Sequence, residues 1–209
     1  MNSVVVFGAG GRAGRAILAE AQRRGVAATA VVRDVAKYPD VPTAVAGDAT
    51  DAEAVAAVAQ GHTAAIVAVY AAEVGPADHV RNAEALLAGL ERAGVHKLLL
   101  VGLATTLRAG PDAPRIFEAE GFNAEWLAFS QGRAGELAVL ERYSGAVDWV
   151  VVTPPMALVE GDDPGYRVQD LGGPLTYAGL ANALLEEVAA DRHHRVQVGV
   201  SGQEGYTDF

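Results

Sequence analysis

Short apolar runs alternate with segments of helical period along most of the chain. The runs cover residues 4–7, 27–32, 43–45, 65–69, 97–103, 147–153 and 196–200. Continuous apolar runs of this length are typical of strands buried on both faces, and their alternation with helices is typical of parallel sheets. The pattern therefore predicts an α/β fold: a doubly wound, mostly parallel sheet of about seven strands with helices on both faces.

The segments between these runs predict five helices, at residues 12–24, 50–61, 76–93, about 132–143 and 176–190. Gly25 and Gly94 follow the first and third at a position where glycine commonly ends a helix. Thr50 and Glu53 have the spacing of a capping box at the start of the second. Two stretches, about 108–130 and 160–174, lack a period and are rich in glycine and proline. Long loops in compact domains are often functional, so we expect lid or substrate loops there.

A glycine-rich turn joins the first predicted strand to the first predicted helix. It contains two overlapping spacings, Gly8-x-Gly10-x-x-Ala13 and Gly8-x-x-Gly11-x-x-Gly14. Glycine there permits a tight turn, lets backbone N–H groups approach a diphosphate and lets the helix pack close to the strand. The helix N-terminus adds unpaired N–H groups and the positive end of its dipole. This context predicts a dinucleotide-binding site, although the same glycines can also serve a tight turn alone.

Local charge favours a phosphate-rich ligand at this end of the chain. The protein has 16 Lys and Arg against 26 Asp and Glu, a net charge of −10, yet residues 11–33 hold five arginines and one glutamate. An arginine at the end of the second strand accommodates a 2′-phosphate, whereas an acidic residue there binds the ribose hydroxyl. Arg33 stands at that position, with Lys37 one turn later and Arg12 in the glycine turn. NADP(H) is therefore favoured over NAD(H), while Asp34 beside Arg33 leaves NAD(H) open.

The overall composition excludes several other classes of protein. The acidic balance argues against nucleic acid and against an anionic membrane surface as partners. The chain has no cysteine, and its five histidines lack metal-ligand spacing, so no metal site is expected. The longest uncharged apolar run, residues 64–72, is too short to span a membrane, and no signal-peptide pattern is present. We expect a cytoplasmic protein with one domain over residues 1–209, either a monomer or a homodimer.

These features together resemble the atypical short-chain dehydrogenase/reductases of the NmrA-like, NAD(P)H-binding group, which have a Rossmann fold. Within that group the chain is most similar to the NADH-flavin reductase and biliverdin-IXβ (flavin) reductase-like proteins. The resemblance covers nearly the whole chain, through the glycine turn and segments 31–34, 47–50, 67–70, 100–105 and 148–155. Their order and spacing are more specific than any one motif.

The resemblance implies roles for residues at the ends of the predicted strands. Arg33 and Lys37, joined by Arg12, are expected to bind the 2′-phosphate, and Asp48 and Ala49 the adenine. The path to the nicotinamide ribose and the nicotinamide wall are expected to be formed by Val69, Tyr70, Ala71, Thr105, Pro154, Pro155 and Met156. Thr105 takes the place of the family's serine. Thr105 and Tyr70 are therefore the candidate catalytic residues.

The positions of the tyrosines and lysines limit the reactions that the protein could catalyse. Carbonyl-reducing relatives use a Tyr-x-x-x-Lys pair, in which the cation lowers the tyrosine pKa. No tyrosine here has a lysine four residues later, and Lys97 starts the fifth strand, on the wrong edge of the sheet. Hydride transfer to a flavin or similar planar acceptor needs little acid or base catalysis from the protein. The aromatic residues Phe117, Phe122, Trp126 and Phe129 supply either an apolar platform for such an acceptor or a cover for the core under a long loop.

Two functions remain open at this point. The first is an NAD(P)H-dependent reductase of a planar acceptor, with flavin as a candidate substrate. The second is a non-catalytic redox sensor that binds NADP(H) and signals its redox state to a partner. Both need the same glycine turn. Glu186 and Glu187 are expected to form a solvated helix surface with no part in either function.

Overall fold

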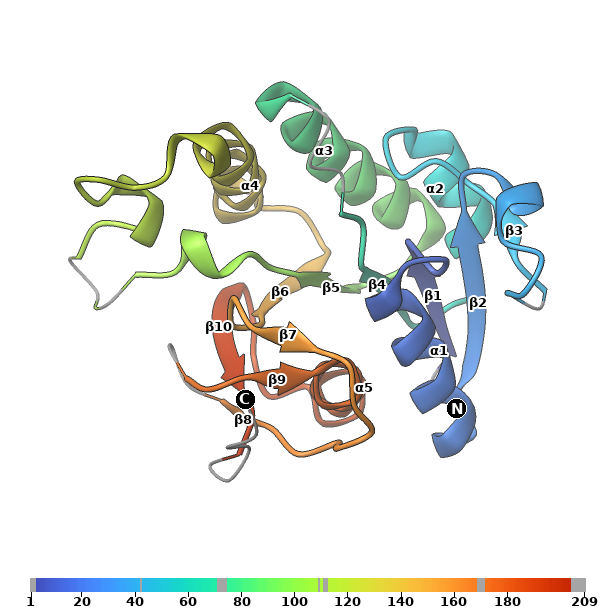
Figure 1. Cartoon of the computed structure of the whole chain (residues 1–209). Coiled ribbons are helices and arrows are strands. Elements are labelled where there is room, and N and C mark those ends of the chain that lie inside the picture. Colours follow the sequence, from blue (N-terminus) through green and yellow to red (C-terminus); the bar gives the residue numbers. More distant parts are fainter. Residues whose placement is uncertain are drawn as a thin grey trace.

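A computed structural model describes residues 3–41, 43–70, 75–108, 110, 113–168 and 172–203. Its main sheet has eight strands in the order β3-β2-β1-β4-β5-β6-β10-β8, all parallel except β8, which pairs antiparallel with β10 (Figure 1). The strands are β1 (Ser3–Phe7), β2 (Ala27–Val32), β3 (Val45–Ala46), β4 (Ala64–Val67), β5 (Lys97–Val101), β6 (Asp148–Thr153), β7 (Leu158–Val159), β8 (Arg167–Val168), β9 (Leu175–Thr176) and β10 (Val196–Ser201). The doubly wound, Rossmann-like α/β fold is confirmed.

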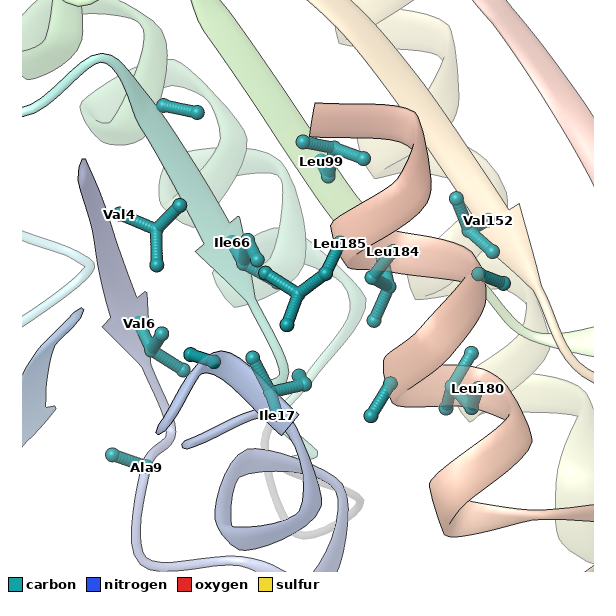
Figure 2. Close-up of a cluster of buried hydrophobic side chains, with 14 of the residues drawn as sticks. Val4, Val6, Ala9, Ile17, Ile66, Leu99, Val152, Leu180, Leu184 and Leu185 are labelled. Carbon is teal, nitrogen blue, oxygen red and sulfur yellow. The ribbon is translucent and has the colours of Figure 1, made fainter. Parts of the chain in front are cut away.

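Helices cover both faces of the sheet, because successive strand residues point to opposite sides. The helices are α1 (Arg12–Arg24), α2 (Ala52–Ala59), α3 (Pro76–Ala93), α4 (Ala124–Arg142) and α5 (Tyr177–Ala190). Val4 and Val6 pack with Ile17 of α1 and Leu184 of α5 on one face (Figure 2). The other face packs Val5 and Phe7 against α2, α3 and α4. Each face therefore has its own apolar core.

The order of the strands places a crevice at one end of the sheet. From β1 the chain proceeds outward through β2 and β3, and then returns to add β4 on the other side of β1. Connections on the two sides of such a reversal point lead in opposite directions, which leaves space beyond the carboxyl ends of the strands. The glycine turn at residues 8–11 lies between β1 and α1 at this point.

Several predicted boundaries need correction. The strand predicted at 43–45 is Val45–Ala46, because Thr43 has φ 57° and cannot continue a strand. The second helix is capped by Asp51 rather than Thr50: the Asp51 side chain accepts hydrogen bonds from the backbone N–H groups of Glu53 and Ala54. The three further strands β7, β8 and β9 have two residues each, too few for a visible alternation.

The predicted loop at 108–130 is partly helical. The fourth helix begins at Ala124, not near residue 132, and Asn123 caps it by accepting a hydrogen bond from the Glu125 N–H at 2.9 Å. A 3-10 turn, Ile116–Glu118, precedes it. The predicted loop at 160–174 contains β8, and its positions 169–171 lie outside the described residues.

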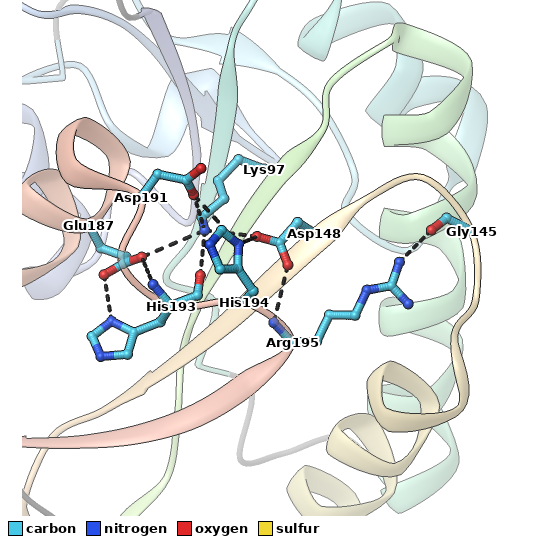
Figure 3. Close-up of polar contacts among 8 residues, drawn as sticks. All are labelled: Lys97, Gly145, Asp148, Glu187, Asp191, His193, His194 and Arg195. Carbon is cyan, nitrogen blue, oxygen red and sulfur yellow. Dashed lines mark hydrogen bonds and ion pairs between the residues drawn. The ribbon is translucent and has the colours of Figure 1, made fainter.

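At the end of the sheet opposite the crevice, a largely buried ammonium group joins three elements (Figure 3). Lys97 Nζ lies 2.9 Å from an Asp148 carboxylate oxygen, 2.6 Å from Asp191 and 3.6 Å from Glu187. Ligand atoms of Asp148, Asp191 and His194 lie within 4.8 Å of one another, a spacing that suits a metal ion, but Lys97 already supplies the positive charge there. Glu187 is buried, so the expectation of a solvated surface at this position is wrong.

This cluster predicts a specific acid sensitivity. Partial burial acts to raise the pKa of Asp148, but hydrogen bonds from Lys97 and His194 outweigh it and hold that pKa below its ordinary value of 3.8. A carboxyl group whose pKa is lowered by folding stabilises the fold at pH values above its ordinary pKa. That stability is lost as the pH falls through the lowered pKa. Asp148→Asn is therefore expected to cost roughly 1.5 kcal/mol at neutral pH, with the difference from wild type shrinking below about pH 4. Urea unfolding at a series of pH values measures it, and a difference that stays constant into acid would contradict it.

None of the helices in the described part of the chain combines the length and the apolar character needed to cross a bilayer.

Candidate functional site

The glycine turn forms a cradle of backbone that side chains would fill. Gly8 has φ 77°, and a Cβ there would lie 2.5 Å from the carbonyl oxygen of Ala68. A Cβ on Gly14 would lie 2.2 Å from the Gly8 carbonyl oxygen, so α1 packs directly on the turn. Gly11 precedes α1 without a side-chain cap, which leaves the first N–H groups of the helix available to an anion. These features fit the diphosphate of a dinucleotide.

A cleft of about 1000 Å³ extends from this cradle along the carboxyl ends of the strands. Its lining includes Arg33, Lys37 and Asp48, which follow β2 and β3, and also Trp126 and Phe129 of α4. The glycine cradle, beside the reversal point of the sheet, lines the same cleft. A single cleft thus joins a polar, phosphate-suited end to an aromatic end.

Most of the predicted site residues line this cleft. They are Gly8, Gly10, Gly11, Arg12, Ala13, Arg33, Lys37, Asp48, Ala49, Val69, Tyr70, Pro154, Pro155 and Met156. Gly14 lies behind the turn, where it allows the close helix packing, and Ala71 lies outside the described residues. The structure therefore brings these residues together, and their contacts with a ligand stay predictions.

Thr105 is placed differently from the other candidates. Its side chain is buried, and its hydroxyl lies 2.8 Å from the Ser130 hydroxyl of α4. It is not among the residues that line the cleft. A direct catalytic contact by Thr105 stays a prediction. In the structure, its hydrogen bond with Ser130 connects the turn after β5 to α4.

Two carboxylates at the polar end are partly engaged by local hydrogen bonds. An Asp34 oxygen accepts from the Ala36 N–H at 3.0 Å, and its other oxygen lies 3.9 Å from Lys37 Nζ. An Asp48 oxygen accepts from the backbone N–H and the hydroxyl of Thr50, at 2.9 and 2.8 Å. Arg33 is exposed beside them. The end of β2 therefore offers Arg33 and Lys37 as cations, since the contact of Lys37 with Asp34 is between exposed groups and is weak.

Arg12 contacts Glu160, which follows β7, and Tyr177, which follows β9. Its guanidinium carbon lies 5.1 Å from the centre of the Tyr177 ring, and a terminal nitrogen lies 3.9 Å from a Glu160 carboxylate oxygen. Both Arg12 and Glu160 are exposed. The ion pair is weak at this exposure, so Arg12 is available to a more highly charged partner.

The aromatic end of the cleft is formed by three rings. The ring centre of Phe129 lies 4.9 Å from that of Tyr70 and 6.5 Å from that of Trp126. Tyr70 is 63% exposed and Trp126 41% exposed, so both present apolar surface to solvent. Phe117 and Phe122 are half-buried and do not line the cleft. Half of the predicted platform therefore faces the cleft.

Sequence reasoning missed several cleft-lining residues, among them Tyr38, His79, Asn82 and Arg133. The Tyr38 ring lies over Gly10, where a Cβ would come within 2.3 Å of it. His79 and Asn82 are one turn apart on α3. Arg133 follows Phe129 by four residues on α4. This is the spacing of the Tyr-x-x-x-Lys pair, but phenylalanine stands in the place of the tyrosine and arginine in the place of the lysine. A search of helical faces for any ring-and-cation pair at this spacing would have found it.

Comparison with known proteins agrees with this geometry. Residues 8–198 match the model of the NAD(P)H-binding family, and the chain belongs to that family. No curated protein sequence matches the chain.

Solved structures with the same fold cover nearly the whole chain. A candidate exported protein from Burkholderia pseudomallei has 26% identity and a TM-score of 0.84, over 96% of this chain and 100% of its own. A candidate NADH-flavin reductase from Streptococcus pneumoniae has 24% identity and a TM-score of 0.84, over 97% and 100%. The anaerobilin reductase ChuY from Escherichia coli O157:H7 has 19% identity and a TM-score of 0.77, over 99% and 100%.

Proposed function

We propose that this protein is an NADPH-dependent reductase that transfers a hydride to a flavin or a similar planar acceptor. The observation that carries the proposal is the single cleft that joins the glycine cradle to the aromatic end. Similar structures described as a candidate NADH-flavin reductase and an anaerobilin reductase support it. The chain acts as one NAD(P)-binding unit over residues 1–209.

The residues of the cleft have distinct tasks in this proposal. The cradle at Gly8, Gly10 and Gly11 holds the diphosphate through backbone N–H groups, with the N-terminus of α1 adding its dipole. Arg33 and Lys37 bind the 2′-phosphate. When bound, the dihydronicotinamide supplies the hydride. Aromatic side chains exclude water and orient the acceptor, whose second proton comes from solvent.

Oxidation of NADPH in the presence of riboflavin, FMN or small quinones tests the reaction. We expect turnover with at least one of them, measured as the loss of absorbance of the reduced nicotinamide. Binding titrations of NADPH and NADH are made on the same samples. Tight binding of NADPH without turnover on any acceptor would contradict the reductase and favour a redox sensor.

Replacing Arg33 with alanine is expected to weaken NADPH binding by about ten- to a hundredfold and to change NADH binding by less than about twofold, because charge-assisted hydrogen bonds to the 2′-phosphate contribute roughly 1.5–3 kcal/mol. Titration of both nucleotides measures this. Arg23→Ala removes the same charge at the far end of α1 and serves as the control. Equal losses for the two nucleotides would show that Arg33 does not recognise the 2′-phosphate.

A further inference from the structure

A buried ion pair closes the wall of the cleft beside the aromatic rings. Arg133 and Glu136, three residues apart on α4, have side chains that are 8% and 4% exposed, with Nη1 and Oε2 2.6 Å apart. The other terminal nitrogen of Arg133 donates a hydrogen bond to the carbonyl oxygen of Val101, the last residue of β5. Both terminal nitrogens are therefore engaged, and the guanidinium plane is fixed at the wall.

The orientation of this pair places its positive end toward the cleft. Arg133 lines the cleft, whereas Glu136 lies behind it. Asp78 also lines the cleft, but its carboxylate is paired with Arg81 and accepts a hydrogen bond from the Gly75 N–H at 3.0 Å. The Asp78 side chain is also 34% exposed, whereas that of Arg133 is 8% exposed, so Arg133 is the charged group held almost fully buried beside the rings in this part of the described chain.

Stability alone gives little reason for such a pair. Removing two charges from water costs more than their attraction commonly returns, and apolar residues of similar size would serve the core as well. Burial raises the pKa of Glu136, although Arg133 and Asn82 act in the opposite direction. A charged pair kept at a cleft wall against this cost is typical of functional sites.

Asn82 of α3 adds a second polar group at the same place. Its side-chain nitrogen lies 3.5 Å from Glu136 Oε1, and its residue is 7% exposed and lines the cleft. Its side-chain oxygen has no hydrogen-bond partner among the described residues. Buried polar atoms normally have partners, so this end of the cleft suits a ligand with a hydrogen-bonding edge.

We infer that Arg133 stabilises the negative charge that a planar acceptor gains when it takes up a hydride, and that Glu136 is the positioning residue that holds Arg133. The inference rests on the proposed function. The acceptor class is a conjugated ring system with a carbonyl or imide edge, such as a flavin or a quinone. Its rings lie against Tyr70, Trp126 and Phe129, and its edge faces Arg133.

The electron balance of the step explains why a cation is needed. A hydride carries two electrons and one proton from the dihydronicotinamide to the neutral acceptor. The acceptor thereby becomes an anion, with its charge spread onto the carbonyl edge, and then takes a second proton from water. A fixed cation at that edge stabilises the charge as it develops, without reorganisation.

Two quinones of the same ring system test the inference. 1,4-Naphthoquinone is neutral, whereas 2-hydroxy-1,4-naphthoquinone is ionised at neutral pH and represents the charged product. Binding to the NADP⁺-saturated protein is followed by quenching of tryptophan fluorescence, to which Trp126 and Trp149 both contribute. Arg133→Met is expected to weaken binding of the anion by at least about tenfold and binding of the neutral quinone by less than about twofold. Arg142→Met, at the exposed end of the same helix, is the matched control.

Steady-state kinetics separate charge stabilisation from binding. With NADPH and 1,4-naphthoquinone, Arg133→Met is expected to lower kcat by at least about tenfold with little change in KM for either substrate. Arg133→Lys keeps a cation and should recover part of kcat. Glu136→Gln should lower kcat less than Arg133→Met, because the cation remains but is held less firmly.

A double variant keeps the test valid if Arg133→Met leaves Glu136 uncompensated and does not fold. Arg133→Met with Glu136→Met removes both charges, a change that cores commonly tolerate. Selective loss of anion binding in this variant supports the inference. Unchanged anion binding, or equal loss of both quinones, would overturn it. Failure of the wild type to bind NADPH would instead overturn the proposed function.

Discussion

Replacing Gly14 with alanine is expected to destabilise the protein by about 2 kcal/mol and to weaken NADPH binding by about a hundredfold. Inside a helix, alanine is normally favoured over glycine by about 1 kcal/mol, so packing decides whether the substitution stabilises or destabilises the protein. Here the new Cβ would lie 2.2 Å from the Gly8 carbonyl oxygen and 2.7 Å from Ala9 Cα. Both are backbone atoms, so α1 must move away from the turn, and overpacking of this kind costs roughly 1 to 3 kcal/mol. The shift also displaces the N–H groups at the start of α1, each worth roughly 1.5 kcal/mol or more to an anion.

Urea unfolding and NADPH titration measure the two effects. Gly11→Ala is the control for stability, because its Cβ would lie 3.5 Å from the Gly8 carbonyl oxygen, which is an ordinary contact. We expect its free energy of unfolding to stay within about 0.5 kcal/mol of wild type. A Gly14→Ala variant as stable as Gly11→Ala would show that α1 does not pack on the turn as described.

Replacing Lys97 with methionine is expected to destabilise the protein by about 3 to 5 kcal/mol. The side chain keeps its apolar length, but the carboxylates of Asp148, Glu187 and Asp191 lose their shared cation. Glu187 has a side chain only 7% exposed and keeps its contacts with the His193 N–H and ring, at 2.9 and 2.7 Å, but removing the cation from a buried ion pair commonly carries a penalty of this size. Against a typical total stability of about 5 to 15 kcal/mol, the loss is large enough to lower the yield of folded protein.

The chain supplies its own control, because its only other lysine is exposed. Lys37 has a side chain 74% exposed and lies 3.9 Å from one Asp34 oxygen. Lys37→Met should change the free energy of unfolding by less than about 0.5 kcal/mol. Denaturant unfolding of both variants measures the two changes in the free energy of unfolding. Similar small changes in the two would mean that the Lys97 cluster contributes little to stability.

Local patterns predicted the sheet and the glycine cradle well. The apolar runs at β1, β5 and β6 are almost wholly buried, so they carry a strong and continuous signal. The cradle depends on residues 8–14, which are adjacent in sequence. Its geometry follows from what glycine permits at a strand-to-helix turn.

The start of α4 could not be found in the same way. Residues 124–128 are all exposed, so the first turns of the helix lack the apolar period that marks a helix packed on a core. The signal that remains is the cap: Asn123 precedes the helix and accepts a hydrogen bond from the Glu125 N–H. Because the start was placed too late, Trp126 and Phe129 were assigned to a loop.

The polar clusters depend on contacts between distant parts of the chain. Lys97 meets Asp148 across neighbouring strands, and meets Glu187 from a helix much later in the sequence. The position of Arg133 at the cleft depends on its hydrogen bond to the Val101 carbonyl oxygen and on the packing of α4 beside the cleft. Such pairings follow from tertiary packing, which no local pattern specifies.

The two ends of strand β5 lie in different surroundings. Lys97 anchors one end, and Gly102 and Leu103 border the cleft just beyond the other. A protein engineer can therefore strengthen the anchored end, or attach the molecule to a support there, without covering the cleft at the opposite end.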